Sequence, residues 1–104
     1  ELLDSKLFEH CAKLSMDIPP HAWDAQGVAL VLNAYAKLDI VNTELFRHLA
    51  AIAIGLPGSN FNAQAVSNVA NAFARADLLD ANLFARLSEI SKALGPGDFS
   101  AQAV

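Results

Sequence analysis

Carboxamide and basic side chains recur at helical spacing in two stretches of the sequence. Within each stretch the spacing is i, i+4, i+7 and i+11, so on a helix these side chains share one face. A carboxamide both donates and accepts hydrogen bonds and can pair with a base edge, while lysine and arginine can reach phosphates. The first row is Gln26, Leu30, Asn33 and Lys37, the second is Gln64, Asn68, Asn71 and Arg75, and Gln102 begins a third.

The polar members of these rows are the candidate RNA-binding residues and are called the amide row below. An ordinary solvent-exposed helix face would also be polar, and for a single helix that is the simpler interpretation. If the helices stack, however, the rows form one continuous ladder. The amide row comprises Gln26, Asn33, Lys37, Gln64, Asn68, Asn71 and Arg75.

The net charge of −4, from 7 Lys and Arg against 11 Asp and Glu, has the wrong sign for binding nucleic acid through bulk positive charge. Any RNA contact must therefore be local. Several acids are explained as helix caps, among them Asp24 and Asp80, so the net charge is weak evidence against an RNA ligand.

Composition excludes several other classes of protein. With 54% hydrophobic and 17% charged residues the chain is not disordered, and its longest apolar run, residues 49–54, is far shorter than the roughly 20 residues of a membrane span. The single cysteine, Cys11, cannot form an internal disulfide, and no Cys/His cluster has metal-ligand spacing. No catalytic constellation is apparent. We therefore expect a non-enzyme with no cofactor, no metal and no small-molecule substrate.

The sequence repeats with a period of 38 residues. Trp23-Asp24-Ala25-Gln26 aligns with Phe61-Asn62-Ala63-Gln64 and with Phe99-Ser100-Ala101-Gln102, and thirteen positions are identical between residues 23–60 and 61–98. We expect a partial repeat over 1–22, full repeats over 23–60 and 61–98, and the start of another over 99–104. Because the sequence lacks an initiating methionine and ends inside an expected helix, we also expect it to be part of a longer protein, of which any targeting segment cannot be judged.

Each unit is predicted to contain two helices. The first spans about 25–38 and again 63–76, after the caps Asp24 and Asn62, and the second follows the caps Asp4, Asn42 and Asp80. Aromatic or aliphatic residues directly before the caps have the spacing of hydrophobic staples, as in the pair Leu79 and Phe84. Proline and glycine separate the units, and no stretch has strand periodicity. The predicted fold is all-α, an α-solenoid of 38-residue helix-turn-helix repeats.

Helical periodicity also predicts which faces are buried. The buried stripes are Val28, Val31, Tyr35 and Leu38 on the first helix, with Val66, Val69 and Phe73 in the next copy, and Leu45, Phe46, Leu49 and Ile52 on the second helix. Cys11 shares the column of Leu49 and is expected to be a small core residue. His10, His48 and Arg86 share an outward column, which either touches RNA or an acidic partner or, more simply, has no role.

Two segments carry a family resemblance. Leu32-Asn33-Ala34-Tyr35-Ala36-Lys37-Leu38 and Val69-Ala70-Asn71-Ala72-Phe73-Ala74-Arg75, each preceded by an aromatic and "x-A-Q" and followed by "L-F", resemble the octotricopeptide and heptatricopeptide repeats. Many relatives have tryptophan where Asn33 and Asn71 stand. The resemblance implies kinship with RAP-domain and FAST-kinase-like organellar RNA-binding proteins, an α-solenoid, and a mitochondrial location, with a plastid as the less favoured alternative.

Two functions follow from these observations. The first is an RNA-binding helical-repeat protein that binds organellar rRNA within a mitoribosome or an rRNA-maturation particle. The second is a protein-protein scaffold that grips neighbouring proteins of a ribonucleoprotein assembly, with only incidental RNA contact. In modular repeat readers two or three side chains per repeat select a base, so the amide row would read at most a few nucleotides.

Overall fold

The computed structural model describes residues 5–94, which form five α-helices and two short 3-10 helices and contain no strand. Each element between residues 5 and 55 has a counterpart 38 residues further along, with the same length and the same boundaries in register. The described part of the chain is therefore all-α and repetitive, as predicted. The elements are α1 (Ser5–Asp17), η1 (Pro20–Ala22), α2 (Ala25–Lys37), α3 (Thr43–Gly55), η2 (Gly58–Asn60), α4 (Ala63–Arg75) and α5 (Ala81–Ala93).

Side-chain caps start four of the helices. The backbone N–H groups of Gly27 and Ala65 donate to the side-chain oxygens of Asp24 and Asn62 at 2.7 and 2.8 Å. Asn42 and Asp80 accept in the same way at the starts of α3 and α5. Each cap satisfies an amide that the helix itself leaves without a partner, which fixes where the helix begins. The cap expected at Asp4 lies outside the described residues.

The first helices end in a left-handed residue. Asp39 after α2 and Asp77 after α4 have φ of 56° and 57°. The N–H of Ile40 donates to the carbonyl of Tyr35 at 3.0 Å, and that of Asp39 donates to Ala36 at 3.0 Å, which together form a Schellman motif. This reversal turns the chain back, so that the second helix of each repeat can pack on the first.

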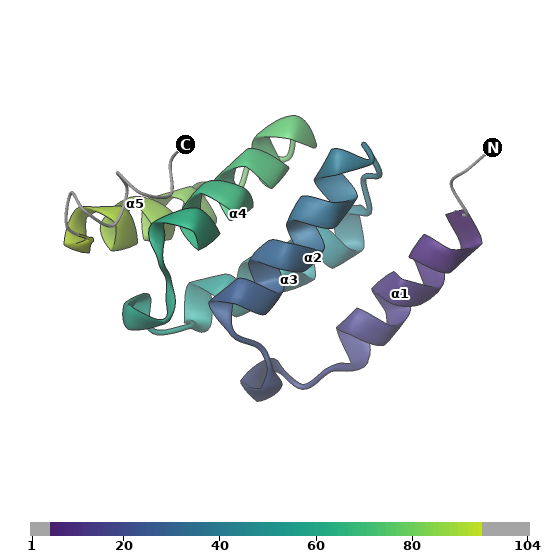
Figure 1. Cartoon of the computed structure of the whole chain (residues 1–104), viewed down its shortest axis with the longest axis horizontal. Coiled ribbons are helices and arrows are strands. Elements are labelled where there is room, and N and C mark those ends of the chain that lie inside the picture. The colour runs from purple at the N-terminus through teal and green to yellow at the C-terminus, as the bar shows by residue number, and fades with distance from the viewer. Residues whose placement is uncertain (1–4, 95–104) are drawn as a thin grey trace.

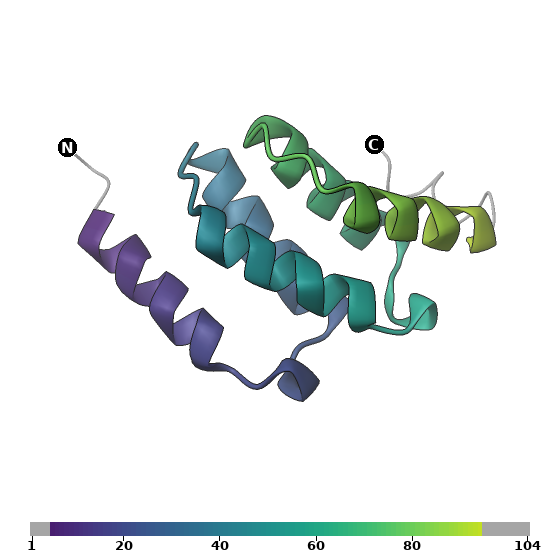
Figure 2. The same cartoon turned by 180° about the vertical axis from the view of Figure 1, so that it is seen from behind.

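The helices form two layers (Figures 1 and 2). The first helices of the repeats, α2 and α4, lie side by side, and the second helices, α1, α3 and α5, form the other layer. The contact between α2 and α4 is the most extensive between any two described helices, and α3 meets α1 and α5 over less of its length. Small side chains such as Ala29, Ala36 and Ala72 are buried in the first layer and permit this close approach. The wider spacing of the second layer places the first helices on the inner side of the array.

One core runs between the two layers. Leu45, Phe46 and Leu49 of α3 are fully buried, and the rings of Phe46 and Phe73 lie 5.4 Å apart between centroids. The predicted stripes on α3 and α4 are confirmed. No helix among residues 5–94 has both the length and the apolar character needed to cross a lipid bilayer.

Several packing predictions were wrong. Leu38, expected in the stripe of α2, is exposed, and Val31 is only partly buried. Leu32 and Ala36 are buried instead, because α4 packs against α2 whereas no described helix covers the side of Leu38. Leu79, expected to staple onto Phe84, is 90% exposed and packs on little. Cys11 is only partly buried, although its counterparts Leu49 and Leu87 lie in the core.

Candidate nucleic-acid interface

The structure places the described amide row on the side of the first-helix layer that faces solvent, away from the second helices. Gln26, Lys37, Gln64, Asn71 and Arg75 are exposed, and Asn33 and Asn68 are partly buried. None of these side chains points into the core, because the stripe that faces the second-helix layer is occupied by apolar residues on both helices. Gln102, which begins the third row, lies outside the described residues. The row is thus a surface feature of two adjacent helices.

A small polar hollow lies where the amino-terminal halves of α2 and α4 meet. Its volume is about 120 Å³, and its floor includes the methyl groups of Ala29 and Ala65. The remaining lining residues are Gln26, Leu30, Asn62, Gln64 and Asn68. The Asn62 oxygen already accepts from the Ala65 N–H, so this side chain serves as a cap. Carboxamides from two repeats therefore line one hollow together with three apolar side chains, an arrangement that can hold the edge and the face of a flat polar group.

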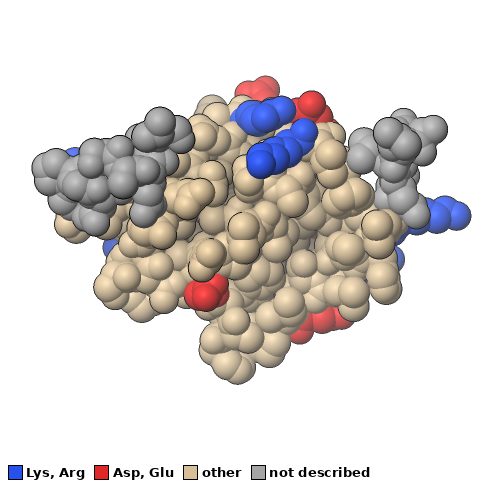
Figure 3. All heavy atoms as spheres, in the orientation of Figure 1, with Lys and Arg blue, Asp and Glu red and all other residues tan. Residues whose placement is uncertain are grey.

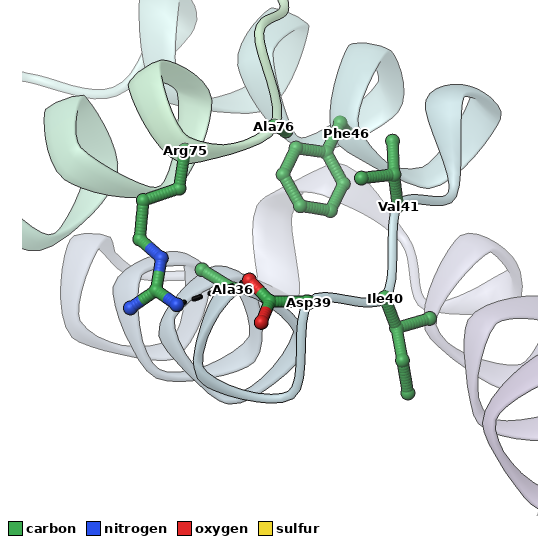
Figure 4. A pocket seen from close by; sticks show the side chains of 7 residues that line it. All are labelled: Ala36, Asp39, Ile40, Val41, Phe46, Arg75 and Ala76. Atoms are coloured by element: carbon green, nitrogen blue, oxygen red, sulfur yellow. Dashed lines mark hydrogen bonds and ion pairs between the residues drawn. The ribbon is translucent and has the colours of Figure 1, made fainter.

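The cationic end of the row is not freely available for phosphate. Arg75 Nη2 lies 3.0 Å from Asp39 Oδ1, in an ion pair that joins the end of α4 to the turn after α2. Figure 4 shows the guanidinium extending from α4 towards this carboxylate, at the rim of a hollow of about 90 Å³ that is also lined by Val41 and Phe46. Both partners are well exposed, so solvent and salt screen the pair and its stability is small.

Basic and acidic side chains lie together at one edge of this face, and other charged side chains lie separately along its rim (Figure 3). Basic side chains gather over the carboxyl-terminal ends of α2 and α4, next to acidic ones, and most of the remaining surface in this view is uncharged. Lys37 and Arg75 end the two helices, and Asp39 and Asp77 follow them. The two charges of each sign cancel, so the affinity of this face for RNA cannot come mainly from net positive charge.

The column on the second helices does not face outward as a unit. His10 is exposed, but His48 and Arg86 are partly buried. Arg86 Nη2 donates to the Leu56 carbonyl at 3.1 Å and Arg86 Nη1 lies 3.6 Å from Glu89, so Arg86 ties α5 to the end of α3. The prediction of an outward column was wrong for Arg86, because η2 folds back over α5 and brings the Leu56 carbonyl within reach.

No group of three or more metal-ligating side chains occurs among residues 5–94. Sequence reasoning missed Asp39 as a member of this surface, although a signal was present, since an aspartate recurs at the same register in Asp77. The recurrence of aspartate after α2 and after α4 indicates the same type of turn in both repeats. The cation that lies beside this turn depends on the offset between the helices, which periodicity alone does not give.

The five α-helices of residues 5–94, arranged in two repeating layers with polar side chains along the inner helices, define a helical-repeat protein of the α-solenoid class. Its sequence matches the family described as "RESC6: RNA-editing substrate-binding complex 6 protein" over residues 4–104, and the chain belongs to this family. No curated protein and no solved structure shows significant similarity to it.

Proposed function

We propose that the chain is an RNA-binding helical-repeat constituent of an RNA-editing substrate-binding complex, and that the amide row is its contact with single-stranded RNA. The family description names a complex that binds RNA-editing substrates, which supports both RNA and protein partners. The observation that carries the proposal is the convergence of Gln26, Gln64 and Asn68 on one hollow between adjacent repeats. Unpaired bases offer the donor and acceptor edges that carboxamides complement.

The location, the target RNA and the type of repeat are also part of the proposal. RNA-editing complexes of kinetoplastids are mitochondrial, which is compatible with a mitochondrial location. The family description favours an editing substrate over ribosomal RNA, so binding of rRNA within a mitoribosome becomes the alternative target. We keep the octotricopeptide or heptatricopeptide type of repeat as the proposed kinship, and expect no catalytic activity.

The proposal predicts separate effects for amides and cations on the affinity for single-stranded RNA. Asn68→Ala combined with Asn71→Ala should weaken binding about tenfold, because each lost hydrogen bond contributes about 0.5–1.5 kcal/mol. The same pair of changes should have no effect on an oligomer of equal length that lacks its bases. Lys37→Glu should weaken binding to both oligomers and lower the salt dependence of log K by about 1 or more.

The matched control is Asn82→Ala, an exposed carboxamide on α5 in the second-helix layer, which should bind RNA like the unaltered chain. Binding of equal strength by the double alanine variant, measured at low salt by fluorescence anisotropy, would remove the amide row from the mechanism. A panel of an editing-substrate transcript and an rRNA fragment of equal length then separates the two candidate targets.

A scaffold function is the second candidate, and a hollow on the other layer favours it. This hollow, of about 410 Å³, lies between η1 and α3 and is lined by apolar groups of Ile52 and Leu56 together with His48. His48 Nε2 is buried and has no hydrogen-bond partner in the structure. An apolar side chain with one polar atom, supplied by a neighbouring protein, would fit this site. His48→Leu should then release the neighbour from the assembled complex without altering RNA affinity.

A further inference from the structure

One end of the solenoid exposes apolar side chains at positions that are buried in the later repeats. Leu7 and Leu14 of α1 are 52% and 53% exposed, whereas Leu45 and Ile52, 38 residues later in α3, are 0% and 8% exposed. Their counterparts in α5, Leu83 and Ile90, are buried as well. The side chains at these positions are leucine or isoleucine in all three helices, so the difference lies in what covers them.

The adjacent helix α2 shows the same difference along one of its faces. Ala34 is exposed and Val31 is partly buried, but their counterparts in α4, Ala72 and Val69, are almost wholly buried. Leu38 is likewise exposed. In α4 this face packs against α2, the only first helix before it in the described chain, which explains its burial. On α2 the same face has no first helix beside it in residues 5–94.

We propose that the α1–α2 end face, defined by Leu7, Leu14, Ala34 and Leu38, receives one more first helix, supplied by polypeptide that directly precedes residue 1. This helix lies one repeat period before α2. It packs on α1 in the way that α2 packs on α3 and α4 packs on α5. It requires small and β-branched apolar residues on its buried side, as α2 and α4 have. The interface is a further copy of the α2–α4 contact and does not depend on RNA binding.

A second copy of the chain is a poorer occupant of this face. Each described first helix, α2 or α4, is followed within a few residues by its own second helix, which packs directly beneath it. If α2 or α4 of another copy lay on the face, its second helix would need the space that α1 already fills. A first helix that continues directly into α1 meets no such conflict.

Cys11 provides a reporter on this face. It is the only cysteine of the chain and is partly buried, while Leu49 and Leu87 in the same column are buried. A helix that covers Leu7 and Leu14 must also cover the position between them. The rate at which a maleimide alkylates Cys11 therefore measures whether the face is occupied.

The test is a chain that carries a second copy of residues 61–76 directly before Glu1. Residue 76 lies two repeat periods after the position that directly precedes Glu1. The added copy is therefore in register with the helix that we propose. We expect alkylation of Cys11 to slow about tenfold or more and the thermal unfolding midpoint to rise by roughly 5 °C, compared with the 104-residue chain. The matched control has Val69→Asp in the added copy only and should behave like the unextended chain.

Two outcomes would overturn the proposal. One is an unchanged rate of Cys11 alkylation in this chain and also in a second extended chain, which carries a copy of residues 23–38 in place of residues 61–76. The second chain is needed because a single added segment could fail to fold. The other is a 104-residue chain that sediments as a dimer and becomes a monomer with Leu14→Glu, because a second copy would then be the occupant.

Discussion

Asp39 has two roles at the end of α2. Its backbone adopts the left-handed conformation that reverses the chain, and its carboxylate forms an ion pair with Arg75 of the next repeat. Aspartate and asparagine both tolerate this conformation, so the two actions can be separated by changing the charge alone. Under the proposed function, Asp39 would compete with RNA phosphate for the Arg75 guanidinium.

Asp39→Asn should strengthen binding of single-stranded RNA about two- to fivefold at low salt. The substitution frees Arg75 and removes a negative charge from the phosphate path, and exposed ion pairs of this kind are worth about 0.2–1 kcal/mol. The gain should fade at high salt, where screening removes both effects. Fluorescence anisotropy across a salt series checks this, and weaker binding by the variant would show that the intact ion pair itself forms part of the RNA site.

Tyr35 links the first layer to α1, because its hydroxyl donates to the Phe8 carbonyl at 2.6 Å and its ring meets the Phe8 ring edge-on. Burial, and then the nearby Cys11, raise the pKa of the Tyr35 phenol above its ordinary value of 10.0. A phenol with a raised pKa favours the fold in its protonated form. Its contribution is complete below pH 10.0 and is lost as the pH rises through the higher pKa of the folded state.

Tyr35→Phe should accordingly lower the free energy of unfolding by about 0.5–1.5 kcal/mol at neutral pH and remove the part of the alkaline destabilisation that the phenol causes. Since Tyr35 is the only tyrosine, absorbance at tyrosinate wavelengths follows its ionisation directly. Titration of the folded chain with a midpoint at or below that of the urea-unfolded chain would contradict the assignment.

At the scale of the elements, local chemistry fixes the helix starts more firmly than hydrophobic contacts do. The caps at Asp24, Asn42, Asn62 and Asp80 were predictable, because a cap depends only on residues three positions apart. The exposure of Leu79, the partial burial of Arg86 and the Arg75 ion pair were not, because each depends on how neighbouring helices are offset. The exposure of Leu38 has a related cause, because among residues 5–94 no first helix lies beside this side of α2.

Asp80→Ala should lower the free energy of unfolding by about 1 kcal/mol, because the Leu83 N–H loses the acceptor that lies 2.9 Å away. Leu79→Ala, one residue earlier, should change it by less than about 0.5 kcal/mol because that side chain is mostly exposed. Urea unfolding followed by circular dichroism compares the two directly. A larger loss for Leu79→Ala would mean that the staple forms in solution after all.

For the molecule as a whole, the two layers divide the surface into an inner face with carboxamides and an outer face of second helices. The 38-residue period, the all-α class and the solvent-facing position of the amide row were all predictable, because repetition places equivalent residues in equivalent surroundings. Net charge was less informative. Opposite charges lie side by side at the edge of the inner face, so the sum of −4 hides a locally balanced surface.

Under the proposed function, RNA lies along the first helices. Ultraviolet crosslinking of the intact RNA-editing substrate-binding complex, followed by mass spectrometry of this subunit, tests it most directly. We expect crosslinked nucleotides on peptides that contain α2 and α4, concentrated at residues 26–37 and 64–75. Crosslinks confined to α1, α3 and α5, or a subunit crosslinked to proteins alone, would contradict the claim.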